Sequence, residues 1–169
     1  MVATVGLLLG EGFSTMALAP LTAFELANGR LGRAHYAATA LSARGGPVRA
    51  SFGLAVATEP LGAVPDTLLV SGGIAPRETS PDVLDWLARA GGEARRVAGV
   101  CTGAFALAEA GLLDGRAATT HWAHAVRLRE RFPRVRVEAD RIFVRDGPVW
   151  SSAGVTAGTM RSTIVEGHA

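Results

Sequence analysis

The chain has 169 residues and a formal net charge of +2, and it is 49% hydrophobic and 19% charged. This length corresponds to about one domain, and the composition excludes an intrinsically disordered chain. All 17 basic residues are arginine, which excludes the lysine chemistry of P-loops and of pyridoxal phosphate enzymes. The single cysteine, Cys101, excludes an intrachain disulfide and a cysteine-rich zinc site, and we expect no cofactor.

The predicted elements alternate between apolar runs of strand length and helix-like segments, which is typical of βαβ units with a mostly parallel sheet. Residues 47–49 and 53–57 flank a small hairpin-like excursion. We expect strands at residues 2–9, 36–42, 66–71, 96–100, 117–120, 135–137, 142–144 and 149–152, and helices at residues 17–31, 80–90, 102–110 and 122–132.

The helix expected at residues 80–90 has the clearest boundaries. Ser80 is a capping residue, Pro81 fits the first helical position, and Asp82 lies in the first turn. We expect the helix to stop at Gly91 and Gly92, because glycine commonly ends helices.

The charge pattern and hydropathy bear on partners and compartment. Seven arginines between residues 127 and 145 alternate with acidic residues, which favours a solvated face over a nucleic-acid surface. No apolar run reaches 18 residues, so we expect no transmembrane helix. Residues 2–9 lack a preceding basic segment and are interpreted as a buried strand rather than a signal peptide. We expect a cytoplasmic protein with a reduced thiol.

The most informative stretch is Gly99-Val100-Cys101-Thr102-Gly103, which joins an apolar strand to a helical segment. This is the nucleophile-elbow pattern, with cysteine in the position that serine holds in hydrolases. A thiol at a helix N-terminus is favoured as thiolate, and backbone N–H groups there, with that of Gly73, suit a developing oxyanion. The alternative is a buried, inert cysteine at a strand end. The pattern favours an elbow but does not establish catalysis.

His121 is the candidate partner of Cys101. It follows the strand expected at residues 117–120, and the C-terminal ends of parallel strands meet at one edge of a sheet. Histidine there would act as base or hydrogen-bond partner, or would only cap the next helix. His124 lies three residues further on, but no third ligand has fitting spacing, so we expect no metal site.

A longer run carries a family resemblance. It reads Cys-Thr-Gly-Ala-Phe-Ala-Leu-Ala-Glu-Ala-Gly-Leu-Leu-Asp-Gly-Arg over residues 101–116 and Ala-Thr-Thr-His-Trp over residues 118–122. The run resembles the ThiJ/PfpI superfamily, of class I glutamine amidotransferase-like fold, and is most similar to the N-terminal domain of AraC-type, GlxA-like transcriptional regulators. Weaker matches include Gly12-Phe13-Ser14, Ser71-Gly72-Gly73 and the segment 152–158. Isonitrile hydratases share much of the run.

The resemblance implies an α/β fold over residues 1–158: a three-layer α/β/α sandwich with a mostly parallel, flavodoxin-like sheet and a cysteine elbow. Family members continue into a C-terminal helix, and regulators then add a helix-turn-helix domain. Residues 159–169 are short and lack a clear apolar stripe. We therefore expect a truncated last helix, an atypical tail, no DNA-binding domain in this sequence, and no direct DNA contact by it.

One departure from the family concerns an acid that hydrogen-bonds the cysteine in its enzymes. Ala17 lies nearest the expected place, and neither Glu11 nor Glu25 matches it. A Cys101–His121 pair without that acid lacks one way to activate the thiol or to move its proton. The departure therefore favours ligand sensing over turnover.

Two functions remain as hypotheses, beside a third interpretation in which the chain is a truncated remnant with neither function. The first is the ligand-sensing and dimerisation domain of an AraC-type regulator, which implies a homodimer and a small metabolite, for which an amine or amide is one candidate. The second is a cysteine-dependent hydratase or hydrolase that uses Cys101 and His121. For either function the expected ligand-binding residues, besides this pair, are Gly72, Gly73, Thr102, Gly103 and Thr120.

Overall fold

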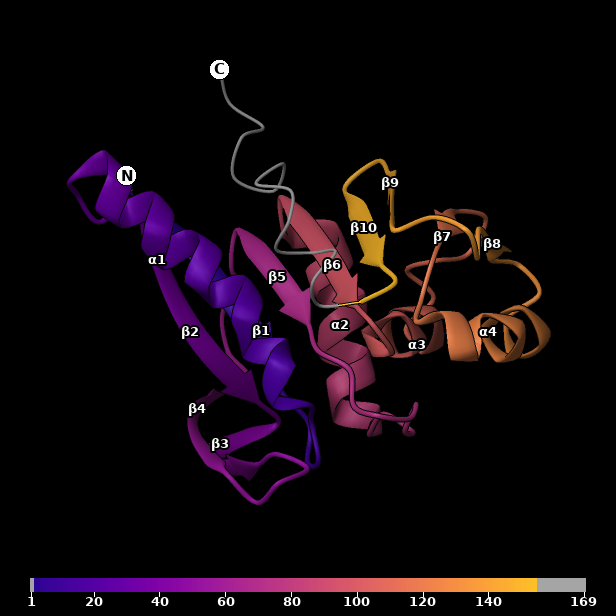
Figure 1. Cartoon of the computed structure of the whole chain (residues 1–169), viewed down its shortest axis with the longest axis horizontal. Helices are drawn as coiled ribbons and strands as arrows, with labels where there is room; N and C mark the ends of the chain where they lie inside the picture. Colours follow the sequence, from indigo (N-terminus) through magenta and orange to yellow (C-terminus); the bar gives the residue numbers. More distant parts are fainter. Residues whose placement is uncertain (1, 155–169) are drawn as a thin grey trace.

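The computed structural model describes residues 2–154, which form one large sheet with helices on both faces (Figure 1). The sheet has eight strands in the order β3-β4-β2-β1-β5-β6-β10-β9. All neighbours are parallel except the antiparallel edge pairs β3–β4 and β9–β10. The strands are β1 (Ala3–Leu8), β2 (Tyr36–Ser42), β3 (Arg44–Arg49), β4 (Ala55–Pro60), β5 (Thr67–Val70), β6 (Arg96–Val100), β9 (Phe143–Asp146) and β10 (Val149–Ser152).

The five central strands, β2-β1-β5-β6-β10, have the 2-1-3-4-5 order of flavodoxin-like folds. This order confirms the predicted mostly parallel, flavodoxin-like sheet. In such sheets ligands bind beyond the C-terminal ends of the strands. The edge that matters for function therefore carries the residues that follow Leu8, Val70 and Val100.

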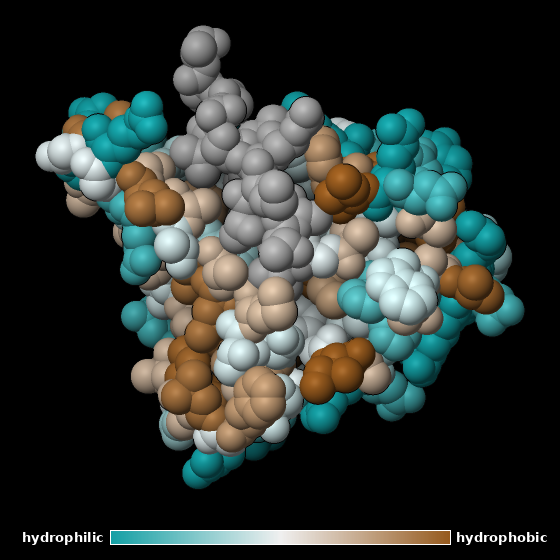
Figure 2. All heavy atoms as spheres, in the orientation of Figure 1, coloured by the Kyte–Doolittle hydropathy of each residue, from teal (hydrophilic) through white to brown (hydrophobic). Residues whose placement is uncertain are grey.

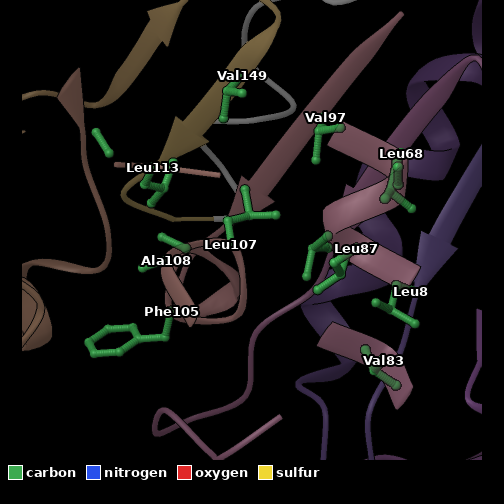
Figure 3. Close-up of a cluster of buried hydrophobic side chains, with 14 of the residues drawn as sticks. Leu8, Leu68, Val83, Leu87, Val97, Phe105, Leu107, Ala108, Leu113 and Val149 are labelled. Carbon is green, nitrogen blue, oxygen red and sulfur yellow. The ribbon is translucent and has the colours of Figure 1, made fainter. Parts of the chain in front are cut away.

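The two faces of the sheet bury separate apolar cores. On one face α1 (Ala19–Leu31) covers a cluster that includes Leu7, Phe24 and Leu69. On the other face α2 (Pro81–Glu93) and α3 (Gly103–Glu109) cover the neighbouring side chains, such as Leu8 and Leu68 (Figure 3). Successive strand residues point to opposite faces, so strands β1 and β5 at the centre of the sheet have buried side chains on both sides. The three-layer prediction is confirmed.

Helix α2 runs further than the sequence predicted. It continues through Gly91 and Gly92 to Glu93. A Cβ on Gly91 would collide with the side chain of Leu112, which lies in the segment after α3. Gly91 is therefore needed for the packing of that segment against α2, and it does not end the helix. Ser80 occupies the expected N-cap position but makes no side-chain cap hydrogen bond. Its hydroxyl instead bonds the carboxylate of Asp82 and lowers the pKa of that group.

A second, small sheet lies beside the main one. It pairs β7 (Ala117–Ala118) with β8 (Arg136–Val137) in parallel, and between them lie the 3-10 turn η2 (Trp122–His124) and α4 (Ala125–Arg131). The strand expected at residues 117–120 is therefore shorter than predicted and is not part of the main sheet. Side-chain hydrogen bonds attach it there, one of them from Thr119 N–H to Ser151 Oγ at 2.9 Å.

Several other predictions from the sequence can be compared with the structure. Strands β6 and β10 have the predicted bounds, and the hairpin-like excursion is a full antiparallel pair, β3–β4. Within residues 2–154 no helix is long and apolar enough to cross a membrane. The predicted truncated helix and atypical tail lie outside the described residues. The space-filling view shows brown hydrophobic residues gathered over part of the face that it presents (Figure 2).

Candidate functional site

The elbow is a strained turn. Cys101 has φ = 57°, and no other non-glycine residue in the described part of the chain has a positive φ. This left-handed conformation costs an L-residue roughly 1–2 kcal/mol. It reverses the chain between the end of β6 at Val100 and the start of α3 at Gly103. The structure thus has the strand-turn-helix geometry that the sequence pattern predicted.

The glycines around Cys101 are required by close backbone contacts. A Cβ on Gly103 would overlap the carbonyl oxygen of Val70, and a Cβ on Gly99 would lie 3.0 Å from Ala104 Cα. A Cβ on Gly72 would lie 2.6 Å from the backbone nitrogen of Thr102. The elbow therefore packs directly against the end of β5, with no side chains between the two backbones.

Three hydrogen bonds hold the elbow in place. The Cys101 N–H donates to the carbonyl of Ser152 at 3.0 Å, which continues the β6–β10 pairing. The Thr120 hydroxyl donates to the carbonyl of Cys101 at 2.8 Å. The Thr102 hydroxyl donates to the carbonyl of Gly73 at 3.0 Å. The elbow is thus attached on three sides, and Thr120 is buried as a structural support.

The thiol of Cys101 is partly buried and has no activating partner in the described residues. Burial raises the pKa of the Cys101 thiol, and a hydrogen bond from the Thr102 N–H offsets this only in part. No carboxylate or imidazole of residues 2–154 forms a hydrogen bond with the sulfur. This direction is opposite to that of the low-pKa cysteines of thiol enzymes.

His121 lies near the elbow but is oriented by its own turn. It directly follows Thr120, and its Nδ1 accepts the N–H of Ala123 at 3.3 Å, so it caps η2. Its ring centroid lies 5.8 Å from that of His124, and His124 Nε2 lies 3.2 Å from the Ile74 carbonyl. The predicted Cys101–His121 pair remains a prediction, because no hydrogen bond joins the two in the described structure. The helix-capping alternative describes the observed contact.

Ala17 is the residue nearest the place where the family resemblance implies an acid, and its surroundings are apolar. Ala17 lies in the 3-10 turn η1 (Thr15–Leu18) and is 1% exposed, packed in the core on the α1 face. Glu11 Oε2 accepts the N–H of Arg49 at 3.3 Å, and Glu25 is exposed on α1. In residues 2–154 no group of three or more His, Cys, Asp or Glu is arranged to hold a metal ion.

A cavity of about 650 Å³ opens beside the elbow. Four of the predicted ligand-binding residues line it, namely Gly72, Gly73, Thr102 and Gly103. The other predicted site residues, Cys101, Thr120 and His121, are not part of its wall. The cavity and the thiol are therefore neighbours that share the backbone of the elbow.

Sequence reasoning missed the rest of the cavity wall. Arg44 comes from hairpin β3–β4, and Arg77 comes from the loop between β5 and α2. Phe13 and Val48 supply buried apolar surface. These segments are far apart in sequence, and backbone bridges from Phe13 to Ala50 and to Gly73 are among the contacts that hold them together. No local pattern signals that meeting.

Comparisons with known proteins agree with this geometry. A family model described as the DJ-1/PfpI family matches residues 3–166. The chain is 40% identical over 172 residues to the HTH-type transcriptional regulator CdhR of Pseudomonas aeruginosa, covering 95% of this chain and 49% of that protein. It is 37% identical to the HTH-type transcriptional regulator GlxA of Rhizobium meliloti, covering 90% of this chain and 49% of the relative. The chain thus spans about half the length of these regulators.

Isonitrile hydratase of Pseudomonas putida is 40% identical over 95 residues, which covers 55% of this chain and 40% of that enzyme. Among solved structures, an AraC family transcriptional regulator from Pseudomonas putida superposes with a TM-score of 0.81 at 24% identity, covering 94% of this chain and 87% of the other. That structural likeness supports the fold alone. With the family match over nearly its whole length and the cysteine elbow in place, the chain belongs to the DJ-1/PfpI family.

Proposed function

We propose that this chain is the ligand-binding domain of an AraC-type transcriptional regulator. The observation that carries the proposal is the 40% identity to such a regulator over 95% of the chain. In the proposal the domain recognises a small metabolite in the cytoplasm and forms a homodimer, and the regulator contacts DNA through a part of the protein other than residues 1–169.

The chemistry of the elbow supports binding rather than turnover. A cysteine nucleophile acts as thiolate and needs a neighbouring base or a lowered pKa. Burial raises the pKa of the Cys101 thiol, and Ala17, the residue nearest the place where the family resemblance implies an acid in enzymes, carries only a methyl group. The backbone of the elbow nevertheless forms part of a cavity wall. In the proposal, the turn at Cys101 supports the wall of a ligand-binding site and does not carry out catalysis.

A turnover assay tests the proposal. The purified chain is incubated with a panel of isonitriles and primary amides, and product is followed by NMR alongside a Cys101→Ala control. The proposal predicts no product above the buffer blank for either protein. In parallel, members of a metabolite panel should raise the melting temperature without being consumed. Turnover that Cys101→Ala abolishes would overturn the proposal.

The second candidate is a cysteine-dependent hydratase or hydrolase of the isonitrile hydratase type. It is favoured by the strained Cys101 turn and by the likeness to isonitrile hydratase over 95 residues. In that function Cys101 Sγ would add to an electrophilic carbon, and His121 Nε2, the ring nitrogen left free by the Ala123 bond, would move protons. The same turnover assay separates the two functions.

A further inference from the structure

The cavity beside the elbow has the dimensions of a small-molecule site. Its volume of about 650 Å³ lies within the roughly 300–1,000 Å³ usual for ligand pockets. It extends from the ends of β1 and β5 to hairpin β3–β4 and to the loop 74–80. Its location at the C-terminal edge of the parallel strands is where open α/β sheets bind ligands.

Arg77 is held in the cavity wall by the backbone beside it. Its Nη1 donates to the carbonyl of Glu11 at 3.0 Å. Gly12, at φ = 72°, leaves the space that the guanidinium fills, since a Cβ there would lie 2.7 Å from Nη2. A guanidinium has five N–H donors, so most of the donors of Arg77 remain available to a ligand.

Arg44 provides a second cationic group in the same wall. The pKa of Asp82 at the start of α2 is lowered mainly by the Ser80 hydrogen bond and only slightly by the charge of Arg44, with which Asp82 forms no ion pair. Neither Arg44 nor Arg77 lies within ion-pair distance of any carboxylate in residues 2–154. By contrast, Arg131, Arg134 and Arg136, which lie away from the cavity, each pair with an Asp or Glu. Two arginines without an ion-pair partner among residues 2–154 thus line one cavity, and guanidinium groups suit bidentate binding of a carboxylate.

The rest of the cavity wall indicates what the other end of such a ligand would be. Leu9, Phe13, Val48 and Val83 are buried and line the cavity, and they suit a short aliphatic chain. Two acidic residues also belong to the wall. Glu11 already accepts the Arg49 N–H, whereas Glu78 is exposed and has no ion-pair partner among the described residues. Glu78 therefore opposes an anionic ligand, and its removal should strengthen binding.

We propose that this cavity binds a small aliphatic monocarboxylate, with its carboxylate on Arg44 and Arg77 and its chain on Phe13 and Val48. The inference rests on the proposed sensing function and names the chemical class of its ligand. In this proposal the ligand does not contact the Cys101 thiol, because Cys101 is not part of the cavity wall. The amine or amide named as one candidate for the sensing function remains an untested alternative, which the probes below distinguish from a carboxylate.

Isothermal titration calorimetry of the full chain at low salt tests the proposal, with hexanoate, hexanamide and hexylamine as probes of equal length. Only hexanoate should bind, and more weakly as salt is added. Arg77→Gln and Arg44→Gln should each weaken hexanoate binding by roughly tenfold, and Glu78→Gln should tighten it by about twofold. Arg127→Gln and Glu130→Gln change the same charges on the exposed α4 surface and should have no effect.

Tighter hexanoate binding by Arg77→Gln with weaker binding by Glu78→Gln, or binding of hexylamine in place of hexanoate, would overturn the proposal. Equal binding of hexanoate and hexanamide, or no binding of any probe by the folded wild-type chain, would also overturn it. Glu78→Gln keeps the test decisive even if Arg77→Gln disturbs the loop, because Glu78 is exposed and makes no ion pair within residues 2–154. Hexanoate binding combined with cysteine-dependent turnover in the separate assay would refute the proposed sensing function but not the proposed carboxylate site.

Discussion

The hydroxyl of Thr120 donates a 2.8 Å hydrogen bond to the carbonyl oxygen of Cys101. This bond joins the segment after β7, which belongs to the small sheet, to the elbow at the end of β6 in the main sheet. It brings His121 close to the elbow without a hydrogen bond between the histidine and the thiol. Thr120 thus acts as a structural support for the strained turn.

Thr120→Val tests this support. The substitution keeps the shape of the side chain and removes the donor, which should cost about 1 kcal/mol of the free energy of unfolding, measured by urea denaturation. It should also change the rate at which iodoacetamide alkylates Cys101, because the turn loosens. Thr119→Val removes a comparable bond, to the Arg141 carbonyl at 3.1 Å, and should leave that rate unchanged. Equal rate changes in both variants would refute a specific role of Thr120.

Two glycine substitutions should have opposite effects on stability. Gly103→Ala places a methyl group against the carbonyl of Val70, so backbone must move and the free energy of unfolding should fall by about 3 kcal/mol or more. Gly92→Ala lies in α2 with nothing near the added Cβ, and should raise that free energy by roughly 0.5–1 kcal/mol. Chemical denaturation measures both. A stable Gly103→Ala protein would contradict the close packing of the elbow.

The strain at Cys101 is measurable by comparing two substitutions of the same residue. Alanine keeps the penalty of φ = 57°, whereas glycine removes it. Cys101→Gly should therefore be more stable than Cys101→Ala by about 1 kcal/mol in thermal or urea unfolding. Equal stability, or a more stable alanine variant, would show that the turn is not strained in solution.

Asp146 links the small sheet to β9 and should make stability depend on pH. Hydrogen bonding from the Ala117 N–H, then the charges of Arg116 and Arg136, hold the pKa of Asp146 below its ordinary 3.8. A lowered folded-state pKa contributes stability above the unfolded-state value, and that stability is lost as pH falls through the lower folded value. Wild type should therefore exceed Asp146→Asn in stability at pH 6, with the difference shrinking below about pH 4.

Urea denaturation at several pH values follows this difference. Asp140→Asn is the matched control, since Asp140 is exposed and makes no ion pair in the described residues, and its profile should parallel wild type. A difference between wild type and Asp146→Asn that stays constant from pH 3 to pH 6 would contradict the assignment.

The central fold was predictable because its signals are local. Strands β6 and β10 are short apolar runs with clear boundaries, and the glycines around Cys101 mark a sharp turn. The end of α2 was mispredicted because Gly91 serves a contact with Leu112, a residue that sequence spacing does not connect to it. A glycine required by tertiary packing has the same appearance in sequence as one that ends a helix.

The candidate site was only half predictable. The elbow and its neighbours Gly72 and Gly73 follow from motifs, whereas the cavity depends on Arg44 and Arg77, which come from a hairpin and a loop. The position of His121 was inferred from a strand in the main sheet, but β7 belongs to the small sheet and is attached through side chains. Long-range contacts of this kind leave no periodic pattern in the sequence.

In the proposed function, Cys101 has no activating partner among residues 2–154, and the domain binds its ligand rather than converting it. The most direct measurement is a pH titration of thiolate absorbance in the wild-type chain, with Cys101→Ser subtracted. Because burial raises the pKa of the thiol, the midpoint should lie above the ordinary 9.0. A midpoint below about 7 would reveal an activated nucleophile and contradict the proposed ligand-binding function.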